Sequence, residues 1–424
     1  MNQTSLHIPL FDMLMCLSGS IDLVSPSLSN HNRQVAYIAS SIAIEDGLSK
    51  QEITDIIIAG ALHDIGALSL KERLNLLRFE VENVERHAEL GYRHIRSFEP
   101  FARISPIIRN HHRHYRDMGA DALTGDPSLR AANIIYLADR ISILMNRAGE
   151  ILNQVPWIIE TISSGNGTLF QARLVDAFVR LASREAFWLA INNRATERHL
   201  AAHMGEENIY FDDDTLLNFA RLFGRVIDFR SPFTAIHSHR VSLVAEALAR
   251  HAGMQPAECS HMKIAGLLHD VGKLAVSTEI LEKPAALSPD EWNIMKSHPF
   301  HTYHLLSGMK GLEHIGQWAS RHHERLDGKG YPFHLRGNEL STGDRVLSVA
   351  DIFTALTENR PYRPGMSVAE AMGILSALAG DGVIDTDITA IARQNAPELD
   401  ELRIQAEVQV NQDYQEFIRG VDLL

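Results

Sequence analysis

The chain repeats one plan, and this repeat limits the possible folds more than any other feature of the sequence. The segment ALHDIG at residues 61–66 returns as LLHDVG at residues 267–272, which is 206 positions further on. Histidines and aspartates elsewhere pair in the same order, with slips of only a few residues. The paired residues are His31 with His237, His63 with His269, Asp64 with Asp270, His87 with His298, His111 with His322, His112 with His323, and Asp139 with Asp351. A repeat of this kind is typical of a duplicated structural unit.

The repeat predicts two domains, which we place at residues 1–205 and 206–424. The boundary falls in a polar, glycine-containing stretch around Gly205, as expected of a linker between compact units. A chain of 424 residues is long enough to build a core in each half.

Apolar residues recur at three- and four-residue spacing through most of the chain, which predicts an all-α fold. A serine followed three residues later by an acidic residue predicts a helix start with a capping box. Such pairs are Ser49 with Glu52, Ser288 with Glu291, and Ser367 with Glu370. Strict alternation is scarce, and residues 404–410 are the one weak strand candidate.

Composition excludes several classes of protein. The net charge of -13 disfavours binding to a nucleic-acid polymer, because the chain and the phosphate backbone repel each other. No uninterrupted apolar run is long enough to predict a membrane span, and the N-terminus lacks the basic region of a secretory signal. The two cysteines, Cys16 and Cys259, show no metal-binding spacing and no disulfide framework, so we expect a cytoplasmic protein.

Histidines and aspartates in the second copy predict a metal site. Imidazole and carboxylate ligands without thiolates suit a divalent transition metal, with iron or manganese expected first and nickel, cobalt or zinc as alternatives. The candidate ligands are His237, His269, Asp270, His298, His322, His323 and Asp351. Seven ligands are too many for one ion but suit two ions that share a carboxylate, and Asp270 is the natural bridge. Two adjacent ions can activate water and clamp a phosphate ester for in-line attack.

The second copy resembles the HD superfamily of metal-dependent phosphohydrolases, and within it the HD-GYP subgroup. The motifs that carry the resemblance are HDVGK at residues 269–273, HP at 298–299, HHERLDGKGYP at 322–332, ADIF at 350–353 and RPYR at 360–363. The resemblance covers about residues 220–375, and the broader HD plan also covers about residues 10–145. It implies two tandem HD-type helical domains that are related by the internal repeat.

The resemblance also implies roles for particular residues. The seven candidate ligands map onto metal ligands of the family, and Asp270 is also counted among the catalytic residues. Lys273 maps onto a catalytic lysine that contacts the scissile phosphate. Arg360 and Arg363 map onto residues that hold substrate phosphates, while Gly330 and Tyr331 shape the lip of the substrate site.

Two positions depart from the family pattern. Phe233 stands where members with three metals carry a glutamate, so we expect two ions. Thr354 replaces a frequent aspartate, which is expected to loosen the orientation of Lys273.

The first copy keeps a ligand set but lacks the substrate motif. Its candidate second metal site consists of His31, His63, Asp64, His87, His111, His112 and Asp139. Ala67 stands in place of Lys273, and the GYP string is absent after His112. A regulatory or stabilising domain is the favoured interpretation, with a second hydrolase and a metal-bound relic as the alternatives.

The resemblance implies a phosphodiesterase that hydrolyses a cyclic dinucleotide second messenger, either cyclic di-GMP or 3'3'-cyclic GMP-AMP. The product would be a linear dinucleotide, with further cleavage to mononucleotides left open. A non-catalytic cyclic dinucleotide receptor and an HD nucleotidohydrolase of other specificity remain as alternatives. A partner protein and a homodimer both remain open.

Overall fold

The structure, a computed structural model, describes residues 6–23, 30–67, 85–119, 125–146, 149–191, 193–205, 208–228, 232–359 and 364–419. The chain separates into two compact units, whose main parts are Pro9–Ile209 and Tyr210–Phe417. The division predicted from the sequence, after residue 205, lies beside residues 206 and 207, which are outside the described residues. That division stays a proposal.

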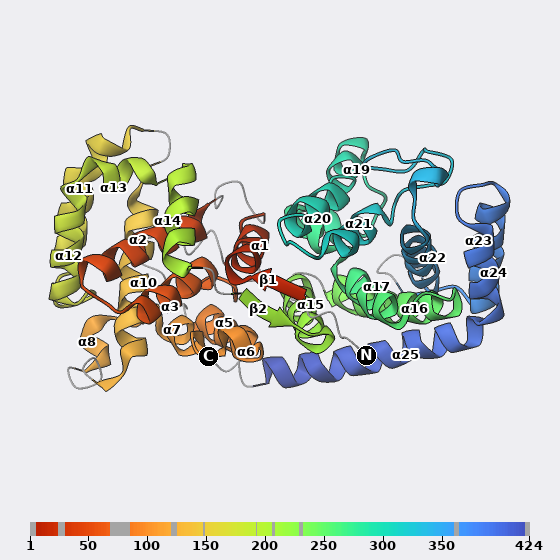
Figure 1. Ribbon diagram of the computed structural model, residues 1–424, viewed down its shortest axis with the longest axis horizontal. Coiled ribbons are helices and arrows are strands. Elements are labelled where there is room, and N and C mark those ends of the chain that lie inside the picture. The colour runs from red at the N-terminus through yellow and green to blue at the C-terminus, as the bar shows by residue number, and fades with distance from the viewer. Residues whose placement is uncertain are drawn as a thin grey trace. The chain divides into compact units, whose positions relative to one another are not determined.

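The first unit is built from helices (Figure 1, red to yellow-green). Its helices are α1 (Leu10–Asp22), α2 (His31–Glu45), α3 (Lys50–Leu62), α5 (Glu85–Arg96), α6 (Glu99–Ala102), α7 (Ser105–Asn110), α8 (Tyr115–Met118), α10 (Pro127–Leu144), α11 (Ile151–Ser164), α12 (Ala172–Ala182), α13 (Glu185–Ala190) and α14 (Arg194–Met204). Strand β1 (Leu6–Pro9) precedes α1 and groups mainly with the second unit, and strand β2 (Asn208–Phe211) spans the division between the units.

The second unit is also helical (Figure 1, green to blue). Its elements are α15 (Asp213–Asp228), α16 (Pro232–His251), α17 (Pro256–Leu268), the 3₁₀ helix η2 (Val271–Ala275), α18 (Thr278–Leu281), α19 (Pro289–Met295), α20 (His298–Leu306), α21 (Glu313–Arg321), the 3₁₀ helix η3 (Gly337–Glu339), α22 (Thr342–Thr357), α23 (Val368–Gly380), α24 (Thr386–Gln394) and α25 (Ala396–Ile418).

The all-α prediction is confirmed, apart from a two-stranded sheet formed by the short strands β1 and β2. The strand candidate at residues 404–410 was wrong, because these residues lie inside α25. Helical spacing explains the misleading alternation. Ala406 and Val410, four residues apart, are buried on one side of the helix, whereas Ile404 and Val408 are exposed on another.

The three predicted capping boxes are confirmed at the starts of α3, α19 and α23. In each, the serine side chain accepts a hydrogen bond from the backbone N–H three residues later, and the acidic side chain accepts one from the serine N–H. Each cap satisfies donors that the first helical turn leaves unpaired and contributes about 1 kcal/mol of stability.

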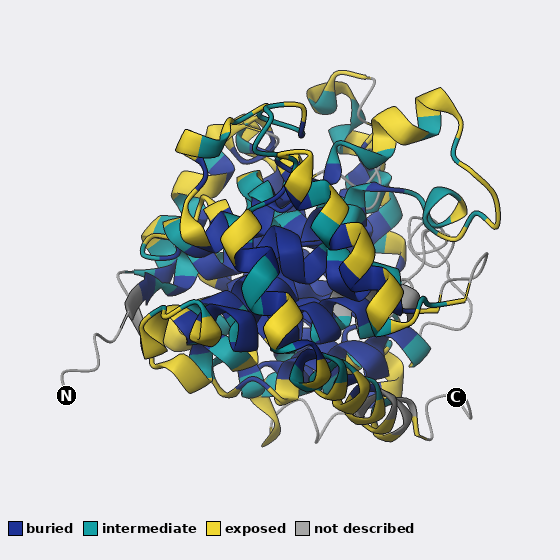
Figure 2. Ribbon diagram, turned by 90° about the vertical axis from the view of Figure 1, so that its right-hand side faces the viewer, coloured by how far each residue is buried: buried dark blue, intermediate teal, exposed yellow. Residues whose placement is uncertain are grey.

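The same helix arrangement forms the interior of both units. In the first unit α2 packs against α3 and α10, and in the second unit the equivalent α16 packs against α17 and α22. Likewise α5 packs against α7, and α20 packs against α21. Figure 2 shows buried positions gathered in the interior and exposed positions on the outer surfaces of the helices that face the viewer. The repeat in the sequence is therefore a repeat in packing.

Glycines allow the close backbone contacts that bring the ligand-bearing segments together. A Cβ atom at Gly272 would lie 1.9 Å from the carbonyl oxygen of His298, and one at Gly66 would lie 2.1 Å from that of His87. Any side chain at these positions would push η2 and the segment after α3 away from the next ligand-bearing helix. Glycine at these two positions therefore allows each His-Asp segment to pack directly against the backbone of the next candidate ligand.

Among the described helices, none combines the length and the apolar character needed to cross a lipid bilayer.

Candidate metal centre

The structure brings all seven predicted ligands of the second copy together in one buried cluster. Each ligand comes from the end or the inner face of a helix. His237 lies on α16, His269 and Asp270 follow α17, His298 begins α20, His322 and His323 follow α21, and Asp351 lies on α22. Two sets of three could each hold an ion, namely His237 with His269 and Asp270, and His298 with His322 and His323.

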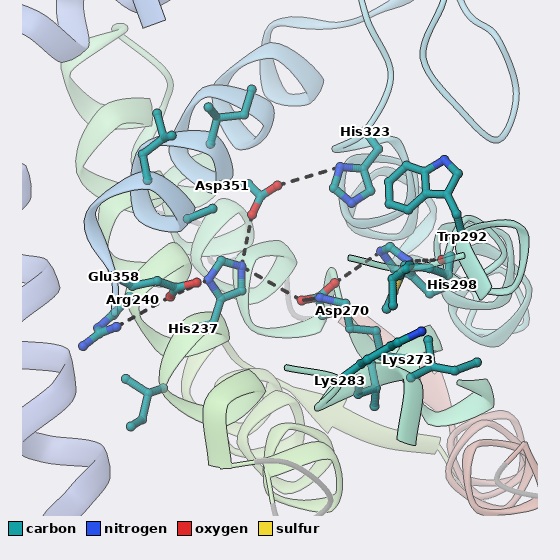
Figure 3. Close-up of a pocket in the computed structure, with 18 of the residues that line it drawn as sticks. His237, Arg240, Asp270, Lys273, Lys283, Trp292, His298, His323, Asp351 and Glu358 are labelled. Atoms are coloured by element: carbon teal, nitrogen blue, oxygen red, sulfur yellow. Dashed lines mark hydrogen bonds and ion pairs between the residues drawn. The ribbon is translucent and has the colours of Figure 1, made fainter. Parts of the chain in front are cut away.

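Asp270 lies between the two sets, as a bridging ligand should (Figure 3). Its Oδ2 atom is 3.3 Å from His269 Nε2 and 4.0 Å from His237 Nε2. Its Oδ1 atom is 3.3 Å from His298 Nε2 and 4.0 Å from His322 Nε2. One carboxylate therefore presents one oxygen to each set.

Backbone carbonyls fix the histidine rings. The Nδ1 atoms of His269, His298 and His322 lie 2.8, 2.7 and 2.7 Å from the carbonyl oxygens three residues earlier. A carbonyl can only accept, so each Nδ1 carries the proton. The Nε2 lone pairs are then left facing the cluster, which is the arrangement of metal-bound histidines.

This geometry requires a cation. His298 Nε2 and His322 Nε2 lie 3.4 Å apart, although both are acceptors. His269 Nε2 is buried without a hydrogen-bond partner, and this residue is 1% exposed. Buried acceptors that face one another are costly unless a proton or a metal ion lies between them. The donor set therefore fits divalent metal ions.

The electrostatics of the cluster also suit metal binding. Burial alone would raise the pKa of Asp270, but the neighbouring His269 and Lys273 outweigh it and hold that pKa well below its usual range. Burial and the adjacent His298 lower the pKa of His323 to about 3, which leaves the ring neutral. An ionised Asp270 and a neutral His323 are in the protonation states that metal ions require of these two ligands.

His237 is positioned by a contact that sequence reasoning missed. Its Nδ1 atom is 3.0 Å from Glu358 Oε2, and its Nε2 atom is 3.1 Å from Asp351 Oδ1. Arg240 Nη1 lies 3.5 Å from the same Glu358 oxygen. Burial would lower the pKa of His237, but Glu358 and Asp351 raise it to about 9. The sequence offered one indication of an acidic partner for His237. Arg240 follows His237 by three positions and shares its helix face, so a carboxylate could contact both side chains.

Lys273 points at the cluster, and its Nζ atom lies 2.5 Å from Asp270 Oδ2. Its pairing with Asp270 means that its orientation does not depend on Thr354, whose Oγ1 atom is buried without a hydrogen-bond partner. The side chain of Phe233 lies outside the described residues.

The GYP loop is held against the cluster. Glu324, buried, accepts hydrogen bonds from the backbone N–H groups of Phe333 and Leu335 at 2.7 and 3.0 Å. A Cβ atom at Gly330 would lie 2.5 Å from the Cα of Glu324, so only glycine fits this turn. The ring of Tyr331 packs 4.8 Å from that of His323. The loop therefore covers one side of the candidate ligands.

A cavity of about 890 Å³ opens onto the cluster. Small-molecule sites typically measure about 300–1,000 Å³, so this cavity has room for a ligand with several rings. Lys273 and Tyr331 line it, whereas Arg360 and Arg363 lie outside the described residues. Among its described lining residues, four anionic side chains outnumber three cationic ones. Bound metal ions would reverse that balance and favour an anionic ligand.

The seven candidate ligands of the first copy also come together. They form two sets, His31 with His63 and Asp64, and His87 with His111 and His112. Asp139 completes the cluster, with its Oδ1 atom 3.2 Å from His31 Nε2.

Comparison with known families identifies this helical metal-site architecture. Residues 28–144 and residues 221–388 each match the HD domain family, and together these matches span more than half of the chain. The chain therefore belongs to the HD-domain family and carries two HD domains in tandem, which confirms the resemblance inferred from the motifs. HD domains are metal-dependent, in agreement with the two ligand clusters.

Particular relatives match all or part of the chain. The chain is 29% identical over 412 residues to the 3'3'-cGAMP-specific phosphodiesterase 1 of Vibrio cholerae serotype O1, and the alignment covers 94% of both chains. It is 38% identical over 186 residues to the cyclic di-GMP phosphodiesterase response regulator RpfG of Xanthomonas campestris pv. campestris, which covers 43% of this chain and 48% of the relative. A crystal structure of a cyclic GMP-AMP specific phosphodiesterase of V. cholerae has the same fold, with a TM-score of 0.66 and 22% identity over 92% of this chain and 98% of the other.

Removal of metal is expected to lower thermal stability. Without cations, the clustered lone pairs and buried carboxylates repel one another, and a ligand at a hundred times its Kd stabilises by about 2.7 kcal/mol. For a unit of this size, that energy corresponds to a fall in Tm of roughly 5–10 °C. The check is calorimetry of metal-loaded protein before and after treatment with dipicolinate, with metal added back as the control. An unchanged Tm would contradict a metal-binding cluster.

Proposed function

We propose that the chain is a metal-dependent phosphodiesterase that hydrolyses a cyclic dinucleotide at the C-terminal cluster. The observation that carries the proposal is Asp270, which is shared by two sets of inward-facing histidines and lies beside Lys273 at the floor of the cavity. The names of the relatives give two candidate substrates, 3'3'-cyclic GMP-AMP and cyclic di-GMP. The product is a linear dinucleotide, which further turnover can convert to mononucleotides.

The proposed ligands are the seven clustered residues, and the proposed cofactor is a pair of divalent ions, with iron or manganese expected first. When bound, such a pair polarises a phosphate ester and supplies a strong nucleophile at neutral pH. Asp270 and the locked histidines hold the ions, and Glu358 fixes the ring of His237 through its Nδ1 atom. Two ions on a set that includes two buried carboxylates also offset the negative charge of the cavity.

Lys273 is the proposed catalytic cation. Its ammonium group reaches the oxygen of Asp270 that faces the His237 set, so it lies where charge would build up on a phosphate held by that set. An ammonium group aimed at developing charge stabilises the transition state more than the bound substrate. It can also protonate the departing ribose oxygen. Arg360 and Arg363 remain proposed phosphate contacts.

The two ends of the cavity differ in chemistry, which suits a ligand with two bases. Figure 3 shows Trp292 at one side of the ligand cluster, and Arg240 with Glu358 at the opposite side. Met295, on the same helix α19 as Trp292, also lines the cavity with an apolar side chain, and Arg240 and Glu358 line it with charged groups. We propose that Trp292 stacks on one base while the scissile phosphate lies over the ions.

Replacement of Trp292 with alanine is expected to raise KM. The indole is 45% exposed and lines the cavity, and it contacts the ring of Tyr331 at 6.0 Å, so it is a ready stacking surface. Loss of one base-stacking contact costs about 1–3 kcal/mol, or roughly a 5- to 100-fold rise in KM, with little change in kcat. The check is steady-state kinetics with both cyclic dinucleotides.

Matched variants make that result specific. Trp292→Phe keeps an aromatic face and should restore most of the affinity. Phe300→Ala removes an aromatic side chain that is also 45% exposed, on α20, and should leave KM near the wild-type value. A Trp292→Ala variant with wild-type KM for both substrates would remove this residue from the binding site.

A substrate panel tests the proposed function as a whole. Metal-loaded protein is incubated with the two cyclic dinucleotides, a linear dinucleotide and mononucleotides, and the products are separated by chromatography. Cleavage that starts with a cyclic dinucleotide supports the proposal, and the faster substrate identifies the specificity. Preferred hydrolysis of mononucleotides would instead favour a general HD nucleotidohydrolase. A cytoplasmic location stays a prediction from the cysteine content, and a partner protein or a homodimer stays open.

A further inference from the structure

The first unit reproduces several of the ligand distances of the second. His31 Nε2 lies 3.2 Å from Asp139 Oδ1, and its counterpart His237 Nε2 lies 3.1 Å from Asp351 Oδ1. The ring centroids of His31 and His63 are 5.4 Å apart, the same separation as those of their counterparts. The first unit therefore has the shape of a metal site.

Backbone and side-chain acceptors also lock these rings. The Nδ1 atoms of His63 and His111 lie 2.9 and 2.6 Å from the carbonyl oxygens three residues earlier, as in the second unit. His31 Nδ1 lies 3.1 Å from Ser142 Oγ, which itself donates to Gln34. His63 Nε2 is buried without a hydrogen-bond partner. The donor set of the first unit therefore fits metal ions by the same criteria as that of the second.

One difference between the two clusters lies beside a candidate ligand. Arg140 follows Asp139 on α10, at the position that Ile352 occupies after Asp351 on α22. Ile352 lines the cavity of the second unit. Arg140 is only 1% exposed, and its Nη2 atom donates to Asp139 Oδ2 over 2.6 Å. The first unit thus carries a buried guanidinium group, bonded to the candidate ligand Asp139, at the sequence position of an isoleucine that lines the cavity of the second unit.

The equivalent oxygen of the second unit has no such partner among the described residues. Asp351 Oδ2 faces His323 Nδ1 at 3.9 Å, on the side of the cavity. Guanidinium groups stay charged in proteins, so a ligand that displaced Arg140 would leave a buried charge without its partner.

The first unit also lacks the catalytic cation. Ala67 is buried at the position of Lys273, and both residues make the same backbone contact, from their N–H to the carbonyl oxygen of the aspartate three residues earlier at 2.9 Å. The backbone is therefore retained while the ammonium group is lost.

We propose that the N-terminal cluster is a closed structural metal site, in which Arg140 takes the place that substrate phosphate takes in the C-terminal site. Metal ions bound there would join α2 and α10 to the C-terminal ends of α3 and α7, and the site would accept no outside anion. This proposal does not depend on the substrate of the C-terminal site. If it holds, the first unit is a stabilising domain and not a second hydrolase.

The test uses the full chain with the C-terminal cluster emptied by His269→Ala and Asp270→Asn. This protein is loaded with cobalt(II), and its metal content and visible spectrum are measured with and without inorganic phosphate. We expect retained cobalt and a spectrum that phosphate does not change. The metal should disappear when His63→Ala and Asp64→Asn are added. Absence of cobalt from the first protein would overturn the proposal, as would a spectral response to phosphate while Arg140 is present.

The matched controls exchange the residue that separates the clusters. Arg140→Ile, in the same background, should make the cobalt spectrum respond to phosphate, and Arg140→Gln serves the same purpose if the isoleucine variant does not fold. The C-terminal site alone, in a chain that carries His63→Ala and Asp64→Asn, should respond to phosphate with Ile352 intact. A spectrum that stays unchanged in both Arg140 variants while this C-terminal control responds would show that Arg140 does not close the site.

Discussion

Asp270→Asn is expected to lower kcat by roughly 10³–10⁴-fold, the size of effect seen when a central catalytic group is removed. Asp270 is the residue that touches both sets of candidate ligands, with one oxygen toward each. An amide has no charge and one acceptor oxygen, so it cannot bridge two ions. Bound metal should fall together with activity, and both are measured on the same preparation by metal analysis and product chromatography.

Two comparison variants show where the effect comes from. Asp381→Asn makes the same chemical change at an exposed position after α23 and controls for the substitution itself. Asp64→Asn makes it at the equivalent position of the first unit, where we expect a loss of less than about tenfold, because that cluster lacks a counterpart of Lys273. Equal losses from Asp64→Asn and Asp270→Asn would contradict a catalytic centre confined to the C-terminal domain.

Lys273→Met should lower kcat by roughly 10²–10³-fold and leave the metal content unchanged. Methionine keeps most of the side-chain volume but removes the ammonium group that lies 2.5 Å from Asp270. Loss of one preorganised donor to developing charge typically has an effect of this size. Because the interaction strengthens in the transition state, KM should change far less than kcat.

Lys283→Met is the matched control for that variant. Lys283 lines the same cavity, but its Nζ atom is paired with Glu291 at 2.6 Å and not with a candidate ligand in the described contacts. Its loss should change KM by a few-fold at most. If Lys273→Met kept the wild-type kcat, Lys273 would have no part in catalysis. If the wild-type chain showed no turnover and the Lys273→Met variant still bound the cyclic dinucleotide, the receptor alternative would be favoured.

The sequence predicted the helical fold and the grouping of the candidate ligands because both follow from local patterns. Helical periodicity needs only neighbours along the chain, and the His-Asp motifs recur at fixed positions in each copy. Residues 404–410 show the limit of such patterns. A short alternating run fits a strand as well as a helix with two apolar faces, and only the packing of Ala406 and Val410 decides between them.

The residues that sequence reasoning missed act through tertiary contacts. Glu358 reaches His237 from the end of another helix, across 121 positions in the chain. Trp292 lies on α19, a short helix whose one sequence motif is its capping box, and it lines the cavity only after the chain has folded. Arg140 sits directly after a predicted ligand, but nothing in the sequence shows whether its side chain faces solvent or the cluster. Their positions therefore required the structure.

The most direct test of the central claim is a single turnover in ¹⁸O-labelled water. Protein loaded anaerobically with iron(II) or manganese(II) is mixed with a slight deficit of each cyclic dinucleotide, and the products are analysed by mass spectrometry. We expect a linear dinucleotide that carries one ¹⁸O atom on its new terminal phosphate, formed by the wild-type chain and not by Asp270→Asn. Tight binding of the cyclic dinucleotides with no labelled product would contradict a hydrolytic C-terminal site and identify a receptor instead.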